Sequence, residues 1–208
     1  MVASPMAGGS GYPVALVLPQ ERELSRWWGL LFLGMFVRGI LAIPHIVILM
    51  VLGLVASLVA LVVWIPILVN GRVPSLWCSL MTEILHRSVR VSAYVMLFPG
   101  GYPAMGFGEP GPVDLSVDAG DRRIGRWWGL PFVGLMARFI VLIPQLIVVQ
   151  ILGVALYVVM LVLWIPILMN GRYPELAMKI AGVYLQYSMR VSAYASFLPV
   201  PYPPFDFA

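Results

Sequence analysis

Apolar residues occur in two very long runs, and these runs dominate the pattern of the chain. From position 27 to position 69 the only charged side chain is Arg38, and from position 127 to position 169 it is Arg138. Each run holds 43 residues, whereas a helix needs about 20 residues to cross the hydrocarbon of a bilayer. The pattern therefore predicts helices that are embedded in a membrane.

Each long run is followed by a stretch with polar and apolar positions at helical spacing. Asn-Gly at 70–71 is predicted to end the first helix, and the next helix carries Glu83, Arg87 and Arg90 on one side. Its opposite side holds Leu76, Leu80, Ile84, Val91 and Val95. Placing the charges at mid-bilayer would cost about 2.5–3.5 kcal/mol each. The stretches 75–98 and 175–198 are therefore predicted to be amphipathic helices that lie on the membrane surface.

The two halves of the chain are copies of one unit. Residue n matches residue n+100 without a gap from position 26 to position 103, and nearly half of the aligned positions are identical. Arg-Trp-Trp-Gly-Leu at 26–30 recurs at 126–130, for example. The repeat predicts two membrane units, residues 21–107 and 121–208, with an N-terminal tail (1–20) and a linker (108–120).

A weaker similarity precedes each unit. The segment VALVL at 14–18 resembles VDLSV at 113–117. The second segment alternates apolar and polar residues, as a half-buried strand does. We therefore predict a short β-strand before each repeat, and the two strands could pair with each other.

Three arrangements of a long run are open. It can be a hairpin that turns near Pro44, an interfacial helix followed by one crossing, or a hairpin that enters and leaves without crossing. Cations flank both ends of each run: Arg22, Arg26, Arg72, Arg87 and Arg90 in one copy, and Arg122, Arg123, Arg126, Arg172, Lys179 and Arg190 in the other. Because cations favour the cytoplasmic side, both flanks are expected there, which requires an even number of crossings.

The predicted fold class is therefore all-α and integral to the membrane. Each of the two tandem parallel repeats is expected to be a membrane-embedded helical hairpin plus an interfacial amphipathic helix. The repeats would be related by an axis along the membrane normal. Four membrane helices, a multi-pass topology and cytoplasmic termini follow from this arrangement.

Composition supports a membrane protein and excludes several other classes. Hydrophobic residues make up 61% of the 208 residues and charged residues only 11%, too few charges to cover a soluble surface. The net charge of +4 comes mainly from arginines at the ends of the apolar runs, so nucleic acid is not an expected partner. The first 11 residues lack the basic and apolar regions of a secretory signal, so the membrane segments are expected to remain in the mature protein. The single cysteine, Cys78, excludes an internal disulfide.

Several recurring motifs match a known family. They are Arg26-Trp27, Ile43-Pro44-His45, Trp64, Asn70-Gly71-Arg72, Pro74, Arg90-Val91-x-Ala93-Tyr94 and the ending Tyr202-Pro203-Pro204-Phe205. On these residues each copy resembles DUF4389, a bacterial membrane domain of unknown function. The first copy departs at its end, with Tyr102-Pro103-Ala104-Met105, and the second has Gln145 in place of the histidine. The resemblance implies a bacterial cytoplasmic membrane protein and no particular activity.

The two histidines are the residues that a pigment or metal would use. A membrane histidine can ligate haem or a chlorophyll-type pigment. However, His45 and His86 recur as Gln145 and Gln186, which favours a structural role. We therefore expect no cofactor, with a pigment or haem at His45 as the alternative. No metal site is expected, because no cluster of carboxylates or thiols accompanies either histidine.

Arg38 and Arg138 are ionisable groups inside apolar runs, which makes them candidates for function. Each could instead reach the headgroups from near a helix end, cap helix carbonyls or bind lipid phosphate. The residues expected to bind lipid or a protein partner are Arg26, Trp27, Arg38, Arg72, Arg90, Arg126, Trp127, Arg138, Arg172, Arg190, Tyr202 and Phe205.

No carboxylate lies inside either long run, which disfavours an enzyme or a proton-coupled transporter. The expected function is that of a non-catalytic structural or accessory subunit of a larger membrane complex, which binds lipids and other membrane-protein subunits. One alternative is a small transporter or channel with a site between the repeats near Arg38 and Arg138. The other is a pigment- or haem-binding subunit that uses His45.

Overall fold

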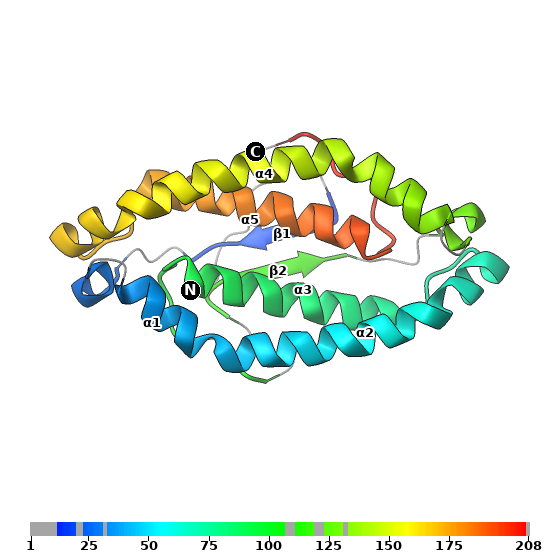
Figure 1. Ribbon diagram of the computed structural model, residues 1–208, viewed down its shortest axis with the longest axis horizontal. Helices are drawn as coiled ribbons and strands as arrows, with labels where there is room; N and C mark the ends of the chain where they lie inside the picture. Colours follow the sequence, from blue (N-terminus) through cyan, green and yellow to red (C-terminus); the bar gives the residue numbers. More distant parts are fainter. Residues whose placement is uncertain are drawn as a thin grey trace.

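The computed structural model describes residues 12–19, 23–30, 33–106, 111–118, 123–130 and 133–206 (Figure 1). Arg22 and Arg122, two of the flanking cations, lie outside the described residues. The elements in chain order are β1 (Val14–Val17), η1 (Arg26–Gly29), α1 (Leu33–Leu41), α2 (Ile43–Asn70), α3 (Ser75–Val95), β2 (Asp114–Val117), η2 (Arg126–Gly129), α4 (Val133–Asn170) and α5 (Glu175–Ala195). Each copy thus has a strand, a 3₁₀ turn, a long apolar helical stretch (α1 and α2, or α4) and a second helix (α3 or α5).

The long apolar runs do not turn back, so the predicted hairpin is wrong. In the second copy α4 continues for 38 residues, and in the first copy α1 and α2 are separated only at Ala42. The Ala42 N–H still donates to the Arg38 carbonyl, at 2.9 Å. Pro44 lies in the first turn of α2, where its missing N–H costs least. The surrounding residues 41–47 lack the Gly, Asn, Asp and Ser that form turns.

The two long helices lie along opposite edges of an elongated molecule and run in opposite directions (Figure 1). They do not contact each other. Instead, η1 packs against α4 and η2 packs against α2, so the start of each copy meets the end of the other copy's long helix. A two-fold axis perpendicular to the long helices therefore relates the repeats.

The middle of the molecule holds α3, α5 and a two-stranded ribbon (Figure 1). α3 packs against α2 and α5 against α4, and the two also contact each other. β1 pairs with β2 in antiparallel register, Val14 opposite Val117 and Val17 opposite Asp114. This pairing confirms the strands expected before each repeat. β1 contacts α5 and β2 contacts α3, so the ribbon ties the two copies together.

The helices α3 and α5 have the predicted extent but not the predicted surroundings. They end at residues 95 and 195, three residues before the expected ends. Arg87 and Arg90 are buried rather than exposed to headgroups. Leu76 is exposed, and Leu80 and Ile84 are half-buried. The charges are inside because loops of the same chain cover them and accept their hydrogen bonds.

The outer surfaces of α2 and α4 are almost entirely apolar and uncovered. Within the described residues these two helices are long and apolar enough to cross a membrane, and only 11% and 17% of their most apolar windows are buried. A core helix of a soluble protein would be mostly buried. The exposed side chains indicate association with a membrane, with two long helices in place of the four expected.

Candidate functional site

Each end of the molecule joins the start of one copy to the end of the other through a glycine. A Cβ atom on Gly29 would lie 2.5 Å from the backbone nitrogen of Leu168, and one on Gly129 would lie 2.7 Å from that of Leu68. Only glycine therefore allows the Arg-Trp-Trp-Gly turn to lie directly against the helix backbone of the other copy. This contact determines where the neighbouring Arg and Trp side chains emerge.

Exposed arginine and tryptophan side chains surround both ends. The Arg126 Cγ lies 3.4 Å from the position of a Cβ on Gly71, and the Arg26 Cγ lies 3.3 Å from that on Gly171. Trp27 and Trp127 are 76% and 81% exposed. Tryptophan and arginine at the border of an apolar surface are typical of the headgroup region of a membrane.

The arginines at one end line a cleft. Arg72, Arg123 and Arg126 surround an open space of about 600 Å³, together with Pro66 and Val69 of α2. At the other end Arg26 and Arg172 recur, but the counterpart of Arg123 is Glu23. From the sequence pattern, Arg123 is predicted only to be one of the flanking cations that set the topology. The charge at this position differs between the copies, with glutamate at 23 and arginine at 123. This difference was the sequence signal that could have identified Arg123 as a special residue.

Arg38 and Arg138 are only 2% and 4% exposed, and each belongs to a helix end of its own copy. The Arg38 guanidinium donates to the carbonyls of Tyr94 and Phe98, at 3.1 and 3.0 Å, and lies 4.8 Å from the Tyr94 ring centre. Arg138 donates to the Tyr194 carbonyl in the same way. The Tyr94 and Tyr194 carbonyls lie in the last turns of α3 and α5, where they also accept hydrogen bonds from the N–H groups of Leu97 and Phe197. Each arginine therefore ties α1 or α4 to the end of the second helix of its own copy. The two guanidiniums do not share a site.

His45 binds the closing segment of its own copy. The imidazole Nε2 lies 3.0 Å from the Pro103 carbonyl and Nδ1 lies 3.1 Å from the Tyr102 hydroxyl. In the second copy the Gln145 amide donates to the Pro203 carbonyl at 2.8 Å, and Tyr202 donates to the Val141 carbonyl. The imidazole of His45 and the amide of Gln145 therefore both bind the backbone of the closing segment in their own copy. Phe205, further along this segment, is exposed.

This equivalence gives a prediction for His45. His45→Gln is expected to leave the stability nearly unchanged, because the amide can donate to the same carbonyl. His45→Leu leaves a buried carbonyl without a donor and is expected to cost about 1–3 kcal/mol. Thermal unfolding in detergent measures both variants. Equal losses for Gln and Leu would contradict a hydrogen-bonding role.

Arg90 and Arg190 bind the strands that pack on their helices. Arg90 donates to the Asp114 carboxylate at 2.9 Å, and the imidazole of His86 lies 2.9 Å from the same oxygen. Arg190 donates to the backbone carbonyl of Val14 at 3.3 Å. Both guanidiniums are buried. Arg38, Arg90, Arg138 and Arg190 therefore hold the chain together, whereas Arg26, Arg72, Arg126 and Arg172 face outward.

The first copy has a polar cleft whose lining differs from the matching positions of the second copy. It encloses about 400 Å³ and is lined by Cys78, Ser79, Thr82, Glu83, His86, Arg90 and Asp114. Three of the positions in α5 that match this lining are Met178, Gly182 and Val183. The second copy thus keeps Gln186 and Arg190 at the matching positions but has no thiol, hydroxyl or carboxylate in place of Cys78, Thr82 and Glu83.

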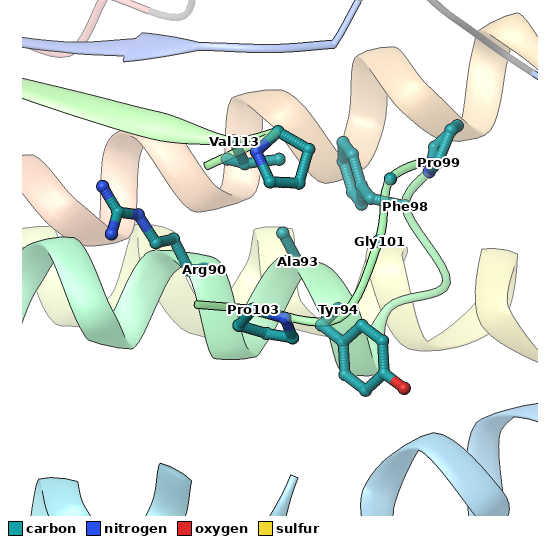
Figure 2. Close-up of a pocket in the computed structure, with 10 residues that line it drawn as sticks. Arg90, Ala93, Tyr94, Phe98, Pro99, Gly101, Pro103 and Val113 are labelled. Atoms are coloured by element: carbon teal, nitrogen blue, oxygen red, sulfur yellow. The ribbon is translucent and has the colours of Figure 1, made fainter. Parts of the chain in front are cut away.

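A second cavity lies where the 98–103 segment folds back along α3. Figure 2 shows Phe98 and Pro99 above Ala93 of the helix, and Pro103 and Tyr94 below it; all of these residues line the cavity. Its volume is about 10 Å³, the space of one water molecule at most. It is therefore a packing gap and not a ligand site.

The family model that matches this chain is described as "Domain of unknown function (DUF4389)", and it matches twice, at residues 33–104 and 133–206. The chain belongs to the DUF4389 family. Tandem DUF4389 domains, as the motifs predicted, are therefore confirmed. No curated protein and no solved structure matches the chain.

The DUF4389 matches begin at Leu33 and Val133 and so exclude both Arg-Trp-Trp-Gly turns. They include the buried Arg38 and Arg138, the His45 and Gln145 positions and both closing Tyr-Pro segments. The residues that hold each unit together thus lie inside the matched regions. The turns that interlock the two DUF4389 units lie outside them.

The environment of Asp114 predicts how the stability of this DUF4389 protein depends on pH. Burial raises the pKa of its carboxyl, but the hydrogen bonds from Arg90, the Leu115 N–H and His86 outweigh that effect, and the net pKa is lowered. A lowered pKa in the folded state stabilises the fold above the unfolded value, about 3.9, and this contribution is lost as the pH falls through the folded value. Asp114→Asn should therefore unfold with a weaker acid dependence than the wild type in a pH series. The same loss of stability at low pH in the variant and the wild type would contradict this prediction.

Proposed function

We propose that this protein is a non-catalytic membrane protein that lies along one leaflet, with α2 and α4 immersed parallel to the bilayer plane. One observation carries the proposal: polar, irregular segments lie beside the middle of the long helices. Arg87, midway along α3, donates to the carbonyls of Met105 and Gly106. If α2 and α4 stood upright, these segments would be at mid-bilayer, where lipid-exposed irregular backbone is not tolerated.

The opposite directions of the two copies fit this orientation. With the two-fold axis along the membrane normal, both Arg- and Trp-bearing ends lie at the same depth. All the outward-facing arginines then face one side, which we assign to the cytoplasm of a bacterial cell. A helix satisfies its own backbone, so α2 and α4 can be immersed in hydrocarbon in any direction.

The polar residues along one side of α3 support a role as an accessory subunit. Ser79, Thr82 and Glu83 line the polar cleft on the ribbon side, whereas Leu80 and Ile84 follow the other side of the helix. The polar side would face the cytoplasm and the apolar side the lipid. We propose that another subunit binds the polar cleft of the first copy, because the second copy has Met178, Gly182 and Val183 in place of Cys78, Thr82 and Glu83.

Two other functions are less well supported. A transporter site between the repeats would need Arg38 and Arg138 in one cavity, but each guanidinium binds the helix end of its own copy. A pigment would need a free ring nitrogen on His45, but both nitrogens lie within hydrogen-bond distance of chain groups.

Site-specific photocrosslinking tests the proposal. A photoreactive amino acid at Ser79 is expected to form an adduct with one defined protein in native membranes. The same group at Lys179, the matching exposed position of the second copy, and at Leu54, on the lipid-facing surface of α2, should give no such adduct. Equal adducts at Ser79 and Lys179, or none at Ser79, would contradict a subunit bound at this cleft.

A further inference from the structure

The arginine cleft at the end of α2 is formed by two segments that are far apart in the sequence. Gly71 adopts the left-handed conformation, with φ 63°, and turns the chain so that Arg72 leaves the helix axis. The Ile124 N–H donates to the Gly71 carbonyl at 3.0 Å, which brings the segment with Arg123 alongside. Arg126 then lies across Gly71. The three guanidiniums are exposed and border one cleft.

Helix geometry alone does not explain three cations here. Cations near a helix C-terminus interact favourably with its dipole, and this accounts for Arg72 and Arg126. The end of α4 has the same requirement, and among the described residues it carries Arg172 and Arg26, while the position that matches Arg123 is Glu23. Counted over the described residues, the first cleft is lined by three arginines, whereas the other end has two arginines and one glutamate. Arg123 is the residue that requires another explanation.

The surroundings of the cleft indicate which anion it fits. Among the described residues that line it there is no carboxylate, and Arg guanidiniums bind phosphate with paired hydrogen bonds. Pro66 and Val69 belong to the last apolar turns of α2, so an acyl chain can lie along the helix while a phosphate lies among the arginines. Inorganic phosphate would use only the cationic half of this surface.

We propose that Arg72, Arg123 and Arg126 form a binding site for the phosphate headgroup of an anionic phospholipid. The proposal rests on the membrane location proposed above. The second copy lacks the site because Glu23 repels the headgroup. The protein therefore binds one such lipid tightly, at the end of α2, despite its duplicated fold.

Native mass spectrometry of the detergent-purified full chain with added phosphatidylglycerol or phosphatidylcholine tests the site. The wild type is expected to retain one phosphatidylglycerol in preference to phosphatidylcholine. Arg123→Glu, which copies the other end, should weaken phosphatidylglycerol binding about tenfold, whereas Arg123→Lys should weaken it less. Glu23→Arg should add a second tight site.

The outcomes separate this proposal from the membrane location. Equal affinity of wild type and Arg123→Glu, or no preference over phosphatidylcholine, would overturn the lipid site. Displacement of the lipid by inorganic phosphate at equal concentration would show a phosphate site instead and overturn the lipid assignment. Resistance of the protein to alkaline carbonate extraction from membranes reports on the membrane location separately, and Arg123→Glu should not change it.

Discussion

Gly29→Ala and Gly129→Ala are each expected to destabilise the protein by about 1–3 kcal/mol. In each turn the new methyl group would lie less than 3 Å from a backbone nitrogen of the other copy's long helix. Backbone atoms cannot rotate away as a side chain can, so the turn and the helix must separate. The double variant should lose more than either single variant, because each glycine forms one of the two interlocking contacts. Chemical or thermal unfolding in detergent micelles measures the loss.

Two other glycines provide matched controls. A Cβ atom on Gly39 or Gly53 would have nothing within 4 Å, and both residues lie in helices. Alanine is favoured over glycine inside a helix by about 0.5–1 kcal/mol. Gly39→Ala and Gly53→Ala should therefore keep or slightly raise the stability. If all four variants behaved alike, close contact between the copies at the Arg-Trp-Trp-Gly turns would not be the cause.

These glycines also show what sequence could and could not provide. The 100-residue offset and the apolar periodicity predicted α3, α5 and the Asn70-Gly71 ending, and a weaker similarity predicted the paired strands, whereas the hairpin predicted for each long run was wrong. They could not predict the direction of the second copy, because that depends on Gly29 meeting Leu168 across 139 positions of the chain. A repeat pattern describes each unit and contains no information on how the units face each other.

The arginines illustrate a second difference between sequence and structure. Flanking cations predicted headgroup contacts, and Arg26, Arg72, Arg126 and Arg172 are indeed exposed. Arg38 and Arg90 have the same residue type and similar neighbours but are buried, because Tyr94, Phe98 and Asp114 provide acceptors for them. Those acceptors come from the end of α3, from the segment that follows it and from β2 of the linker, whose positions depend on tertiary packing. The sequence identified the important residue type without separating its two roles.

The position of the long helices in the membrane gives the prediction with the largest effect. Ser25 and Gly125 are exposed, equivalent positions at opposite ends of the molecule. If the long helices lie parallel to the bilayer, cysteines at both positions should react from the same, cytoplasmic side. If α2 and α4 crossed the bilayer in opposite directions, the two cysteines would react from opposite sides.

Cys78→Met supplies the background without the natural thiol, since methionine occupies the matching position 178. Ser25→Cys and Gly125→Cys are then exposed to a membrane-impermeant maleimide in intact and in lysed spheroplasts. Both should remain unlabelled in intact spheroplasts and react fully after lysis, whereas Leu54→Cys should react poorly in either case because its side chain lies in hydrocarbon. Labelling of one end in intact spheroplasts and of the other only after lysis would rule out the in-plane orientation. The polar segments at mid-length would then have to be covered by another protein, because lipid cannot satisfy their backbone groups.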